Sequence, residues 1–300
     1  MTQKIPSFIS DINNEMIDAA VHALENEKFI LGESVFKFEE EFAKYIGTKN
    51  AISVNSGSSA LHLSLLSVNI SNNSKVITST NSFIASSNTI LSTGAEPILV
   101  DIDESDGNLD MKNNQTNVNA IIPIHIYGNP CDFESVKEFA ETKKIPIIED
   151  ACQAHGATYK GKKVGSLGQL GCFSFYPTKN MTVGGDGGMI TTDDDDLAKT
   201  LISLRDNGRK ESNRSIHEKF GFTMRLNTVN AAIGRVELKN LDEKNKRRKE
   251  IAEIYEKNLS KNILLSTSKF GQSVFHQIVI KHKERDKIKN HLLENGIGTA

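Results

Sequence analysis

The feature that most constrains the fold of this chain is a regular alternation of short apolar segments and helical segments along its first half. The apolar segments have the length of buried strands, and the segments between them repeat apolar residues at helical spacing. Strands are predicted at residues 51–54, 76–77, 97–100, 120–124 and 145–148, with helices at residues 58–66, 83–92 and 133–142. Strands separated by helices favour a mostly parallel sheet covered by helices on both faces. The predicted fold class is therefore α/β.

The two ends of the chain follow other patterns. We expect helix over residues 16–47 with a break at 29–32, a long charged helix at 230–259, a strand at 274–281 and a helix at 285–294. Another strand is expected to begin near residue 296. The predicted domains are a large α/β domain over residues 1–235, and a connecting helix with a smaller, incomplete α+β domain over residues 236–300.

The charge balance bears on possible partners. The chain has 36 Lys and Arg against 38 Asp and Glu, a formal net charge of −2, so no basic field favours nucleic acid or an anionic membrane. The basic run at residues 244–249 shares its helix with several acidic residues, which favours a solvated connecting helix over a nucleic-acid patch. No signal peptide is recognisable and no apolar run approaches the roughly 18 residues of a membrane span, so a cytoplasmic protein is predicted.

The three cysteines do not form a framework. Cys131, Cys152 and Cys172 are odd in number and include no CxxC pair, so buried free thiols in a reducing compartment are expected. Cys152 and His155 loosely resemble a metal pair, but further ligands at metal-site spacing are missing. The acidic run at residues 193–196 is expected to begin a helix. No metal site is predicted.

One lysine stands in a setting that suggests covalent chemistry. Lys179 follows an apolar strand-like run in a turn, and a loop with four glycines comes after it. Its ammonium group can form an imine with an aldehyde cofactor, while nearby hydroxyls and glycine backbone can hold a phosphate. Ser174 and Asn180 could each contact that phosphate or the protein backbone. These features suggest pyridoxal phosphate (PLP); the alternative is a hairpin whose lysine is merely a solvated tip.

Two further segments fit the same cofactor. Residues 55–59, which include Gly57 and Ser58, join a strand to a helix and could bind phosphate through free N–H groups; ordinary helix capping is the alternative. Phe83 follows the next strand and could stack on a flat heteroaromatic ring, although such a residue is more often part of the core.

A polar group follows the strand at residues 145–148. Asp150 could pair with the nitrogen of a pyridine ring and keep it protonated, or it could cap a helix. Gln153 could reach the phenolic oxygen of such a ring. His155 is expected to be a buried imidazole with its hydrogen bonds satisfied.

As a set, these residues resemble the DegT/DnrJ/EryC1/StrS family of PLP-dependent sugar aminotransferases, which have fold type I. The resemblance runs from about residue 5 to the end of the chain and is carried by motifs at residues 38–43, 56–63, 94–103, 125–128, 149–157, 173–180 and 185–188. It implies a mostly parallel, seven-stranded sheet and PLP as the cofactor.

The resemblance also implies a role for each candidate residue. Lys179 would bond to the cofactor and carry the proton between substrate and cofactor carbons. Asp150 would pair with the ring nitrogen, and Gln153 would contact the ring oxygen. The phosphate would be held by Gly57, Ser58 and Ser174, with Asn180 close by, and Phe83 would stack on the ring.

The family's usual reaction moves an amino group, generally from glutamate, to a keto carbon of a nucleotide-linked deoxysugar. Two half-reactions share one site, so ping-pong kinetics are expected. Family members are usually homodimers whose active sites lie at the subunit interface, and the same is expected of this chain.

Two departures from the family pattern qualify this expectation. Thr223 stands where the family commonly has an Asn that reaches the cofactor phosphate of the neighbouring subunit, so weaker phosphate anchoring is expected. Family chains also continue some tens of residues beyond the position of residue 300. The alternative function is therefore a catalytically weak or regulatory binding protein with the same fold. A dehydratase branch, with His in place of the lysine, is disfavoured by Lys179.

Overall fold

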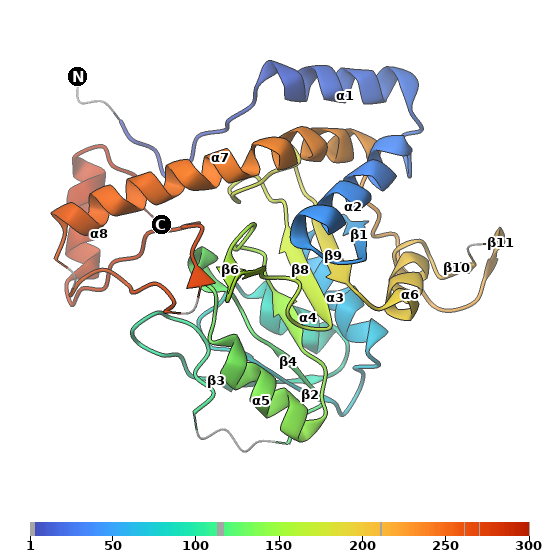
Figure 1. Cartoon of the computed structure of the whole chain (residues 1–300), viewed down its shortest axis with the longest axis horizontal. Helices are drawn as coiled ribbons and strands as arrows, with labels where there is room; N and C mark the ends of the chain where they lie inside the picture. Colours follow the sequence, from blue (N-terminus) through green and yellow to red (C-terminus); the bar gives the residue numbers. More distant parts are fainter. Residues whose placement is uncertain (1–3, 113–116, 211, 261, 270, 300) are drawn as a thin grey trace.

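The centre of the molecule is one large sheet (Figure 1). The computed structural model describes residues 4–112, 117–210, 212–260, 262–269 and 271–299. A parallel ladder is formed by β3 (Glu96–Val100), β2 (Lys75–Ser79) and β4 (Ala120–Ile122). A second ladder is formed by β5 (Ile148–Asp150), β8 (Leu170–Ser174), β9 (Gly188–Thr192) and β1 (Asn50–Val54).

Two isolated parallel bridges join the ladders. They pair Ile121 with Ile147 and Ile124 with Asp150, so that β4 lies beside β5. The strand order is therefore β3-β2-β4-β5-β8-β9-β1, and only β9 runs antiparallel to its neighbours. This arrangement confirms the predicted mostly parallel, seven-stranded sheet.

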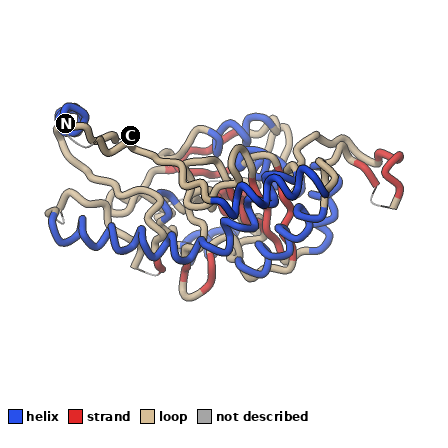
Figure 2. Tube along the Cα trace, turned by 90° about the horizontal axis from the view of Figure 1, so that it is seen from above, coloured by secondary structure: helices blue, strands red, loops and turns tan. Residues whose placement is uncertain are grey.

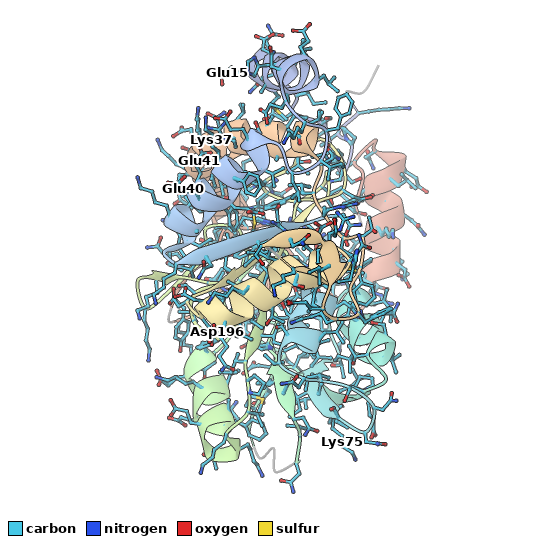
Figure 3. All side chains as sticks on the ribbon, turned by 90° about the vertical axis from the view of Figure 1, so that its right-hand side faces the viewer. Glu15, Lys37, Glu40, Glu41, Lys75 and Asp196 are labelled. Atoms are coloured by element: carbon cyan, nitrogen blue, oxygen red, sulfur yellow. The ribbon has the colours of Figure 1, made fainter. Side chains whose placement is uncertain are left out.

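Helices cover both faces of the sheet because successive residues of a strand point to opposite sides. On β8, Phe173 joins a core with α2 (Glu33–Ile46), α5 (Phe133–Lys143) and α7 (Thr228–Asn258). The neighbouring Cys172 joins a second core with α3 (Gly57–Ser67), α4 (Ala85–Ser92) and α6 (Asp195–Arg205). Charged side chains such as Lys37, Glu40 and Asp196 lie outside these cores (Figure 3).

The termini of the helices follow the expected sequence signals. The predicted break near residue 30 separates α1 (Asn14–Asn26) from α2, and Leu31 adopts a positive φ of 51° there. The acidic run at residues 193–196 begins α6, with Asp194 as its N-cap. Within the described segments, no helix is both long enough and apolar enough to cross a membrane.

Smaller elements surround the sheet. A short sheet comprises β12 (Gly271–Gln272), β6 (Thr158–Tyr159) and β7 (Lys162–Lys163), and η1 (Ile126–Gly128) follows β4. The hairpin of β10 (Arg209–Lys210) and β11 (Asn213–His217) extends from one end of the molecule (Figure 2). At the other end, α8 (Arg285–Glu294) is followed by a parallel bridge between Ile5 and Ile297.

The prediction of a strand at residues 274–281 is wrong. The backbone of this segment bonds to two different regions: Val274 N–H donates to Gly128 O, whereas Lys281 N–H donates to Ile263 O. The positive φ of Phe275, 47°, interrupts the extended conformation between them. Only a single bridge, between Leu264 and Ile280, has strand character.

Two other predictions are refined. The strand predicted at residues 145–148 lies at Ile148–Asp150, so Asp150 is its last residue. The predicted domain boundary after residue 235 falls inside α7, which runs without interruption across it (Figure 1). The division into two domains stays a prediction.

Candidate active site

The predicted site residues gather at the carboxyl edge of the sheet, where parallel strands most often bind ligands. The start of α3 follows β1, Asp150 ends β5, and the loop with Lys179 follows β8. The loop leads into β9, which is antiparallel to β8. Lys179 therefore lies in the long connection of a hairpin, as the hairpin alternative expected.

The start of α3 has the geometry of an anion site. Ser56 is the N-cap: its Oγ accepts from Ser59 N–H at 3.0 Å, and its carbonyl accepts from Ala60 N–H at 3.0 Å. The N–H groups of Gly57 and Ser58 precede these bonds, and a helix supplies no internal acceptor to its first N–H groups. Together with the positive end of the helix dipole, they favour a phosphate.

Gly57 is required at this position by close packing. A Cβ atom there would lie 2.7 Å from Ser174 Cβ and 2.9 Å from Cys152 Sγ. The structure therefore brings Gly57 and Ser174 into contact, although Ser174 follows Gly57 by 117 positions along the chain (174 − 57). This cradle, formed by exposed Ser58, Ser174 and the helix N–H groups, fits the phosphate of PLP.

Asp150 is held by two donors. Its side chain is 6% exposed, its Oδ2 accepts from Ser86 Oγ at 2.8 Å, and its Oδ1 accepts from Cys152 N–H at 3.2 Å. No helix begins at residue 151, so the helix-cap alternative for Asp150 is wrong. A carboxylate that is nearly buried and aligned in this way fits the protonated nitrogen of a pyridine ring.

Gln153 is oriented by the backbone of η1. Its Oε1 accepts from Tyr127 N–H at 2.8 Å, so its amide NH₂ group points elsewhere and remains available to an acceptor such as a ring oxygen. Tyr127 has a positive φ of 59°, and its hydroxyl donates to Asn81 Oδ1 at 3.3 Å.

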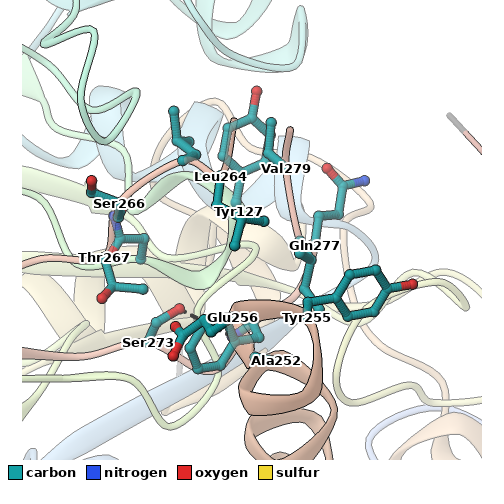
Figure 4. Close-up of a pocket in the computed structure, with 14 residues that line it drawn as sticks. Tyr127, Ala252, Tyr255, Glu256, Leu264, Ser266, Thr267, Ser273, Gln277 and Val279 are labelled. Carbon is teal, nitrogen blue, oxygen red and sulfur yellow. Dashed lines mark hydrogen bonds between the residues drawn. The ribbon is translucent and has the colours of Figure 1, made fainter. Parts of the chain in front are cut away.

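A cavity of about 50 Å³ lies beside Tyr127 (Figure 4). Its other walls come from α7, at Ala252 and Glu256, and from the segments that contain Leu264 and Gln277. The C-terminal part of the chain thus reaches the same residue that orients Gln153.

Phe83 is not a core residue. It is 69% exposed in the turn before α4, and its carbonyl accepts from the N–H of Ser86, the residue that bonds to Asp150. The aromatic ring is therefore available for stacking at the edge of the sheet where Asp150 lies.

Lys179 is half-buried, and its charge acts on two imidazoles. Burial, followed by the charge of Lys179, lowers the pKa of His155 to about 3 and that of His276 to about 2. Both rings are therefore neutral at pH 7. His155 is buried as predicted, and its ring interacts with the backbone of Ser174, although neither ring nitrogen has a hydrogen-bond partner of normal geometry among the described residues.

Asn180 binds protein groups. It is 3% exposed, and its Nδ2 donates to Asn245 Oδ1 and to Val274 O, both at 2.9 Å. Its Oδ1 lies 3.2 Å from His276 Nδ1. Of the two roles considered for Asn180, contact with the protein is the one the structure displays, and it ties the lysine loop to α7 and to the C-terminal segment.

The remaining sequence predictions have mixed outcomes. Cys131 and Cys172 are buried free thiols, whereas Cys152 is only partly buried. Thr223 is exposed, and its hydroxyl donates to Asn207 Oδ1 at 2.9 Å at the base of the hairpin.

Sequence reasoning missed Ser86 and His276. Ser86 follows Phe83 by three residues, in the first turn of α4, so its place just after the predicted stacking residue was a usable signal. For His276 no local signal existed, because it follows Lys179 by 97 residues (276 − 179) in a segment without regular structure.

A mostly parallel seven-stranded sheet, with one antiparallel strand and with a lysine and an aspartate at its carboxyl edge, defines the class of fold type I PLP-dependent enzymes. The model of the DegT/DnrJ/EryC1/StrS aminotransferase family matches residues 10–300, and the chain belongs to this family. Membership confirms the predicted family, aminotransferase class and cofactor, PLP.

Named relatives support the same assignment. The chain is 37% identical to dTDP-3-amino-3,4,6-trideoxy-alpha-D-glucose transaminase of Streptomyces venezuelae over 94% of this chain and 76% of that protein. It is 37% identical to GDP-perosamine synthase of Escherichia coli O157:H7 over 89% of this chain and 76% of that protein. The crystal structure of S. venezuelae DesV with a ketimine intermediate superimposes with a TM-score of 0.90, at 36% identity, over 94% of this chain and 78% of that one.

Proposed function

We propose that this protein transfers an amino group from glutamate to a keto carbon of a nucleotide-linked deoxysugar, within the biosynthesis of an amino sugar or a polysaccharide. The observation that carries the proposal is the convergence of Lys179, Asp150 and the start of α3 at one edge of the sheet. The relatives reported above are named as the transaminase of a dTDP-linked amino sugar and as the synthase of GDP-perosamine, which supports this substrate class.

The described residues supply groups that match those of PLP: N–H donors at the start of α3, a nearly buried carboxylate and a lysine. We assign the phosphate to the N–H groups of Gly57 and Ser58 and to the hydroxyl of Ser174. Bound PLP would supply two things: an aldehyde, which receives the amino group, and a ring that withdraws electrons. Asp150 would hold the ring nitrogen and Gln153 the ring oxygen.

Lys179 Nζ is assigned the proton transfers. The neighbouring His155 and His276 are neutral at pH 7, because burial and the lysine charge lower the pKa of each ring. Because neither ring is charged at pH 7, we assign the bond to the cofactor and the proton transfers to the amino group of Lys179 rather than to an imidazole.

We further propose a homodimer whose subunits share their active sites. Phe83, Tyr176 and Phe220 are 69%, 52% and 80% exposed, and a partner subunit would cover these large apolar side chains. We also propose a cytoplasmic location, because free cysteines are typical of a reducing compartment. The regulatory alternative is not favoured, because the relatives reported above are named as a transaminase and a synthase of amino sugars.

The proposal is tested by absorbance spectroscopy and turnover. Wild-type protein mixed with PLP should develop the band of a lysine-bound cofactor, glutamate should convert it to the amine form, and a suitable nucleotide-linked keto-sugar should restore it. A panel of dTDP-, GDP- and UDP-linked keto-sugars then identifies the substrate.

Lys179→Ala should lose the lysine-bound band and reduce turnover by at least about 1,000-fold, since the covalent and the proton-transfer roles are both removed. Lys162→Ala, in the short strand β7, is the matched control and should behave like the wild type. A band that persists unchanged in Lys179→Ala, or that does not respond to glutamate, would disprove the proposed mechanism.

A further inference from the structure

Two serines support the aspartate of the candidate site: Ser82 lies in the connection before α4, and Ser86 lies in the first turn of α4. Ser86 Oγ lies 2.8 Å from Asp150 Oδ2, and Ser82 Oγ lies 2.8 Å from Ser86 Oγ. The three side chains thus form a chain of hydrogen bonds that ends on the carboxylate.

The chemistry of the groups determines the direction of this chain. An ionised carboxylate only accepts hydrogen bonds, so the single hydroxyl proton of Ser86 goes to Asp150. Ser86 can then only accept from Ser82, which makes Ser82 the donor of the second bond. Hydrogen bonds in series polarise one another, so the bond from Ser86 to the carboxylate is strengthened.

Burial increases the energetic importance of the hydrogen bond from Ser86 to Asp150. Ser86 is 1% exposed and Asp150 is 6% exposed, so bulk water does not replace a lost donor. The other oxygen of the carboxylate, Oδ1, is held at 3.2 Å by Cys152 N–H. One donor on each oxygen determines the plane of the carboxylate and leaves further lone pairs for a third partner.

We propose that Ser86, polarised by Ser82, is a positioning residue that orients Asp150 toward the ring nitrogen of the cofactor. The inference rests on the proposed function, in which Asp150 pairs with that nitrogen. Ser86 itself touches Asp150, and its effect reaches the cofactor through the carboxylate.

The experiment compares Ser86→Ala, Ser86→Thr and Ser87→Ala. Ser87 is the matched control, because it lies in the same first turn of α4 and is only partly buried. Each purified protein is loaded with PLP that carries ¹⁵N in its ring. The ¹⁵N chemical shift then reports the hydrogen bond at the ring nitrogen, independently of turnover.

Ser86→Ala should move the ¹⁵N resonance toward that of free PLP, weaken PLP binding roughly three- to tenfold and lower kcat about tenfold with little change in the KM for the sugar. Ser86→Thr retains the hydroxyl and should restore the wild-type resonance. Ser87→Ala should match the wild type in all three measurements.

A wild-type ¹⁵N resonance in PLP-loaded Ser86→Ala, or no recovery in Ser86→Thr, would overturn the inference and leave the proposed function standing. Failure of the wild-type protein to bind PLP would overturn both. If Ser86→Ala does not fold, Ser82→Ala replaces it: Ser86 is retained but loses its polarising donor, so a smaller shift in the same direction is expected, and an unchanged resonance contradicts the proposal.

Discussion

At the scale of single residues, His155 of the candidate site is both buried and surrounded by positive charge. His155 packs against the tilted rings of Phe173 and Phe175, at ring-centroid distances of 5.5 and 5.8 Å, with no exposed surface. Its neighbourhood also contains the cations of Lys179 and Arg248. An imidazolium ion is doubly disfavoured there, by loss of water and by like charge.

This environment predicts how stability depends on pH. The pKa of His155 is about 3 in the folded protein and about 6.5 in an unfolded chain, so between these values the unfolded state binds more protons. The contribution of His155 to the free energy of unfolding is therefore fully present well above pH 6.5 and is lost progressively as the pH decreases. The contribution of His155 should fall by about 1 kcal/mol between pH 6.5 and 5.5, and by up to about 1.4 kcal/mol for each further unit.

The measurement is urea unfolding of the wild type and of His155→Gln over this range of pH. Because the other titrating groups are common to both proteins, the difference between the two curves isolates His155. Wild-type stability should decline more steeply toward acid, and parallel curves would contradict the assigned protonation of this ring.

At the scale of elements, buried polar networks align the strands that carry the site. Glu149, next to Asp150 on β5, is fully buried and accepts from the N–H groups of Gly165, Leu167 and Gly168 at 2.7 to 2.8 Å. Its Oε2 also lies 3.0 Å from His125 Nε2. Since adjacent strand residues point to opposite faces, Glu149 anchors the end of β5 on one side while Asp150 faces α4 on the other.

Glu149→Gln should therefore destabilise the protein by about 3 kcal/mol, although the two side chains have the same shape. Each oxygen of Glu149 faces at least one backbone N–H group, so either orientation of the amide places its NH₂ group against a donor. Chemical denaturation measures the effect. Glu40→Gln, on the exposed surface of α2, serves as the control and should stay within about 0.5 kcal/mol of the wild type. An equally small effect of Glu149→Gln would show that the network is not required.

At the scale of the whole molecule, the hairpin of β10 and β11 projects from one end (Figure 2). Thr223 lies at its base and bonds to Asn207, while Arg225 pairs with Asp206 at 2.6 Å. Phe220, which follows the hairpin, is 80% exposed. In the homodimer proposed above, the second copy of the chain would cover the exposed ring of Phe220.

Thr223→Asn tests this arrangement. If Thr223 faces the cofactor phosphate of the partner subunit, a longer amide donor should tighten PLP binding by up to about tenfold. Affinity is measured by equilibrium titration at concentrations where sedimentation shows a dimer, with Thr223→Val as the variant that removes the hydroxyl. Equal PLP affinity for the Asn, Val and wild-type proteins would show that Thr223 does not contact the cofactor phosphate.

The sequence by itself determined the order of strands and helices, the family, and the motif residues Gly57, Asp150 and Lys179. These signals are local: a strand, a turn and the first residues of a helix lie within about ten residues of one another, and their periodicity and turn chemistry are visible in the chain. The strand at residues 274–281 was wrongly predicted because its apolar pattern does not reveal that its backbone bonds to two separate regions.

Only the tertiary structure decided which partners these residues have. It placed Ser86 on Asp150, His276 beside Asn180, and the start of α3 against Ser174. It also left Phe83 exposed and both nitrogens of His155 without a hydrogen-bond partner of normal geometry among the described residues. The physical reason is that burial and hydrogen bonding depend on packing between segments that are far apart in the chain, whereas propensity and capping depend on neighbours in sequence.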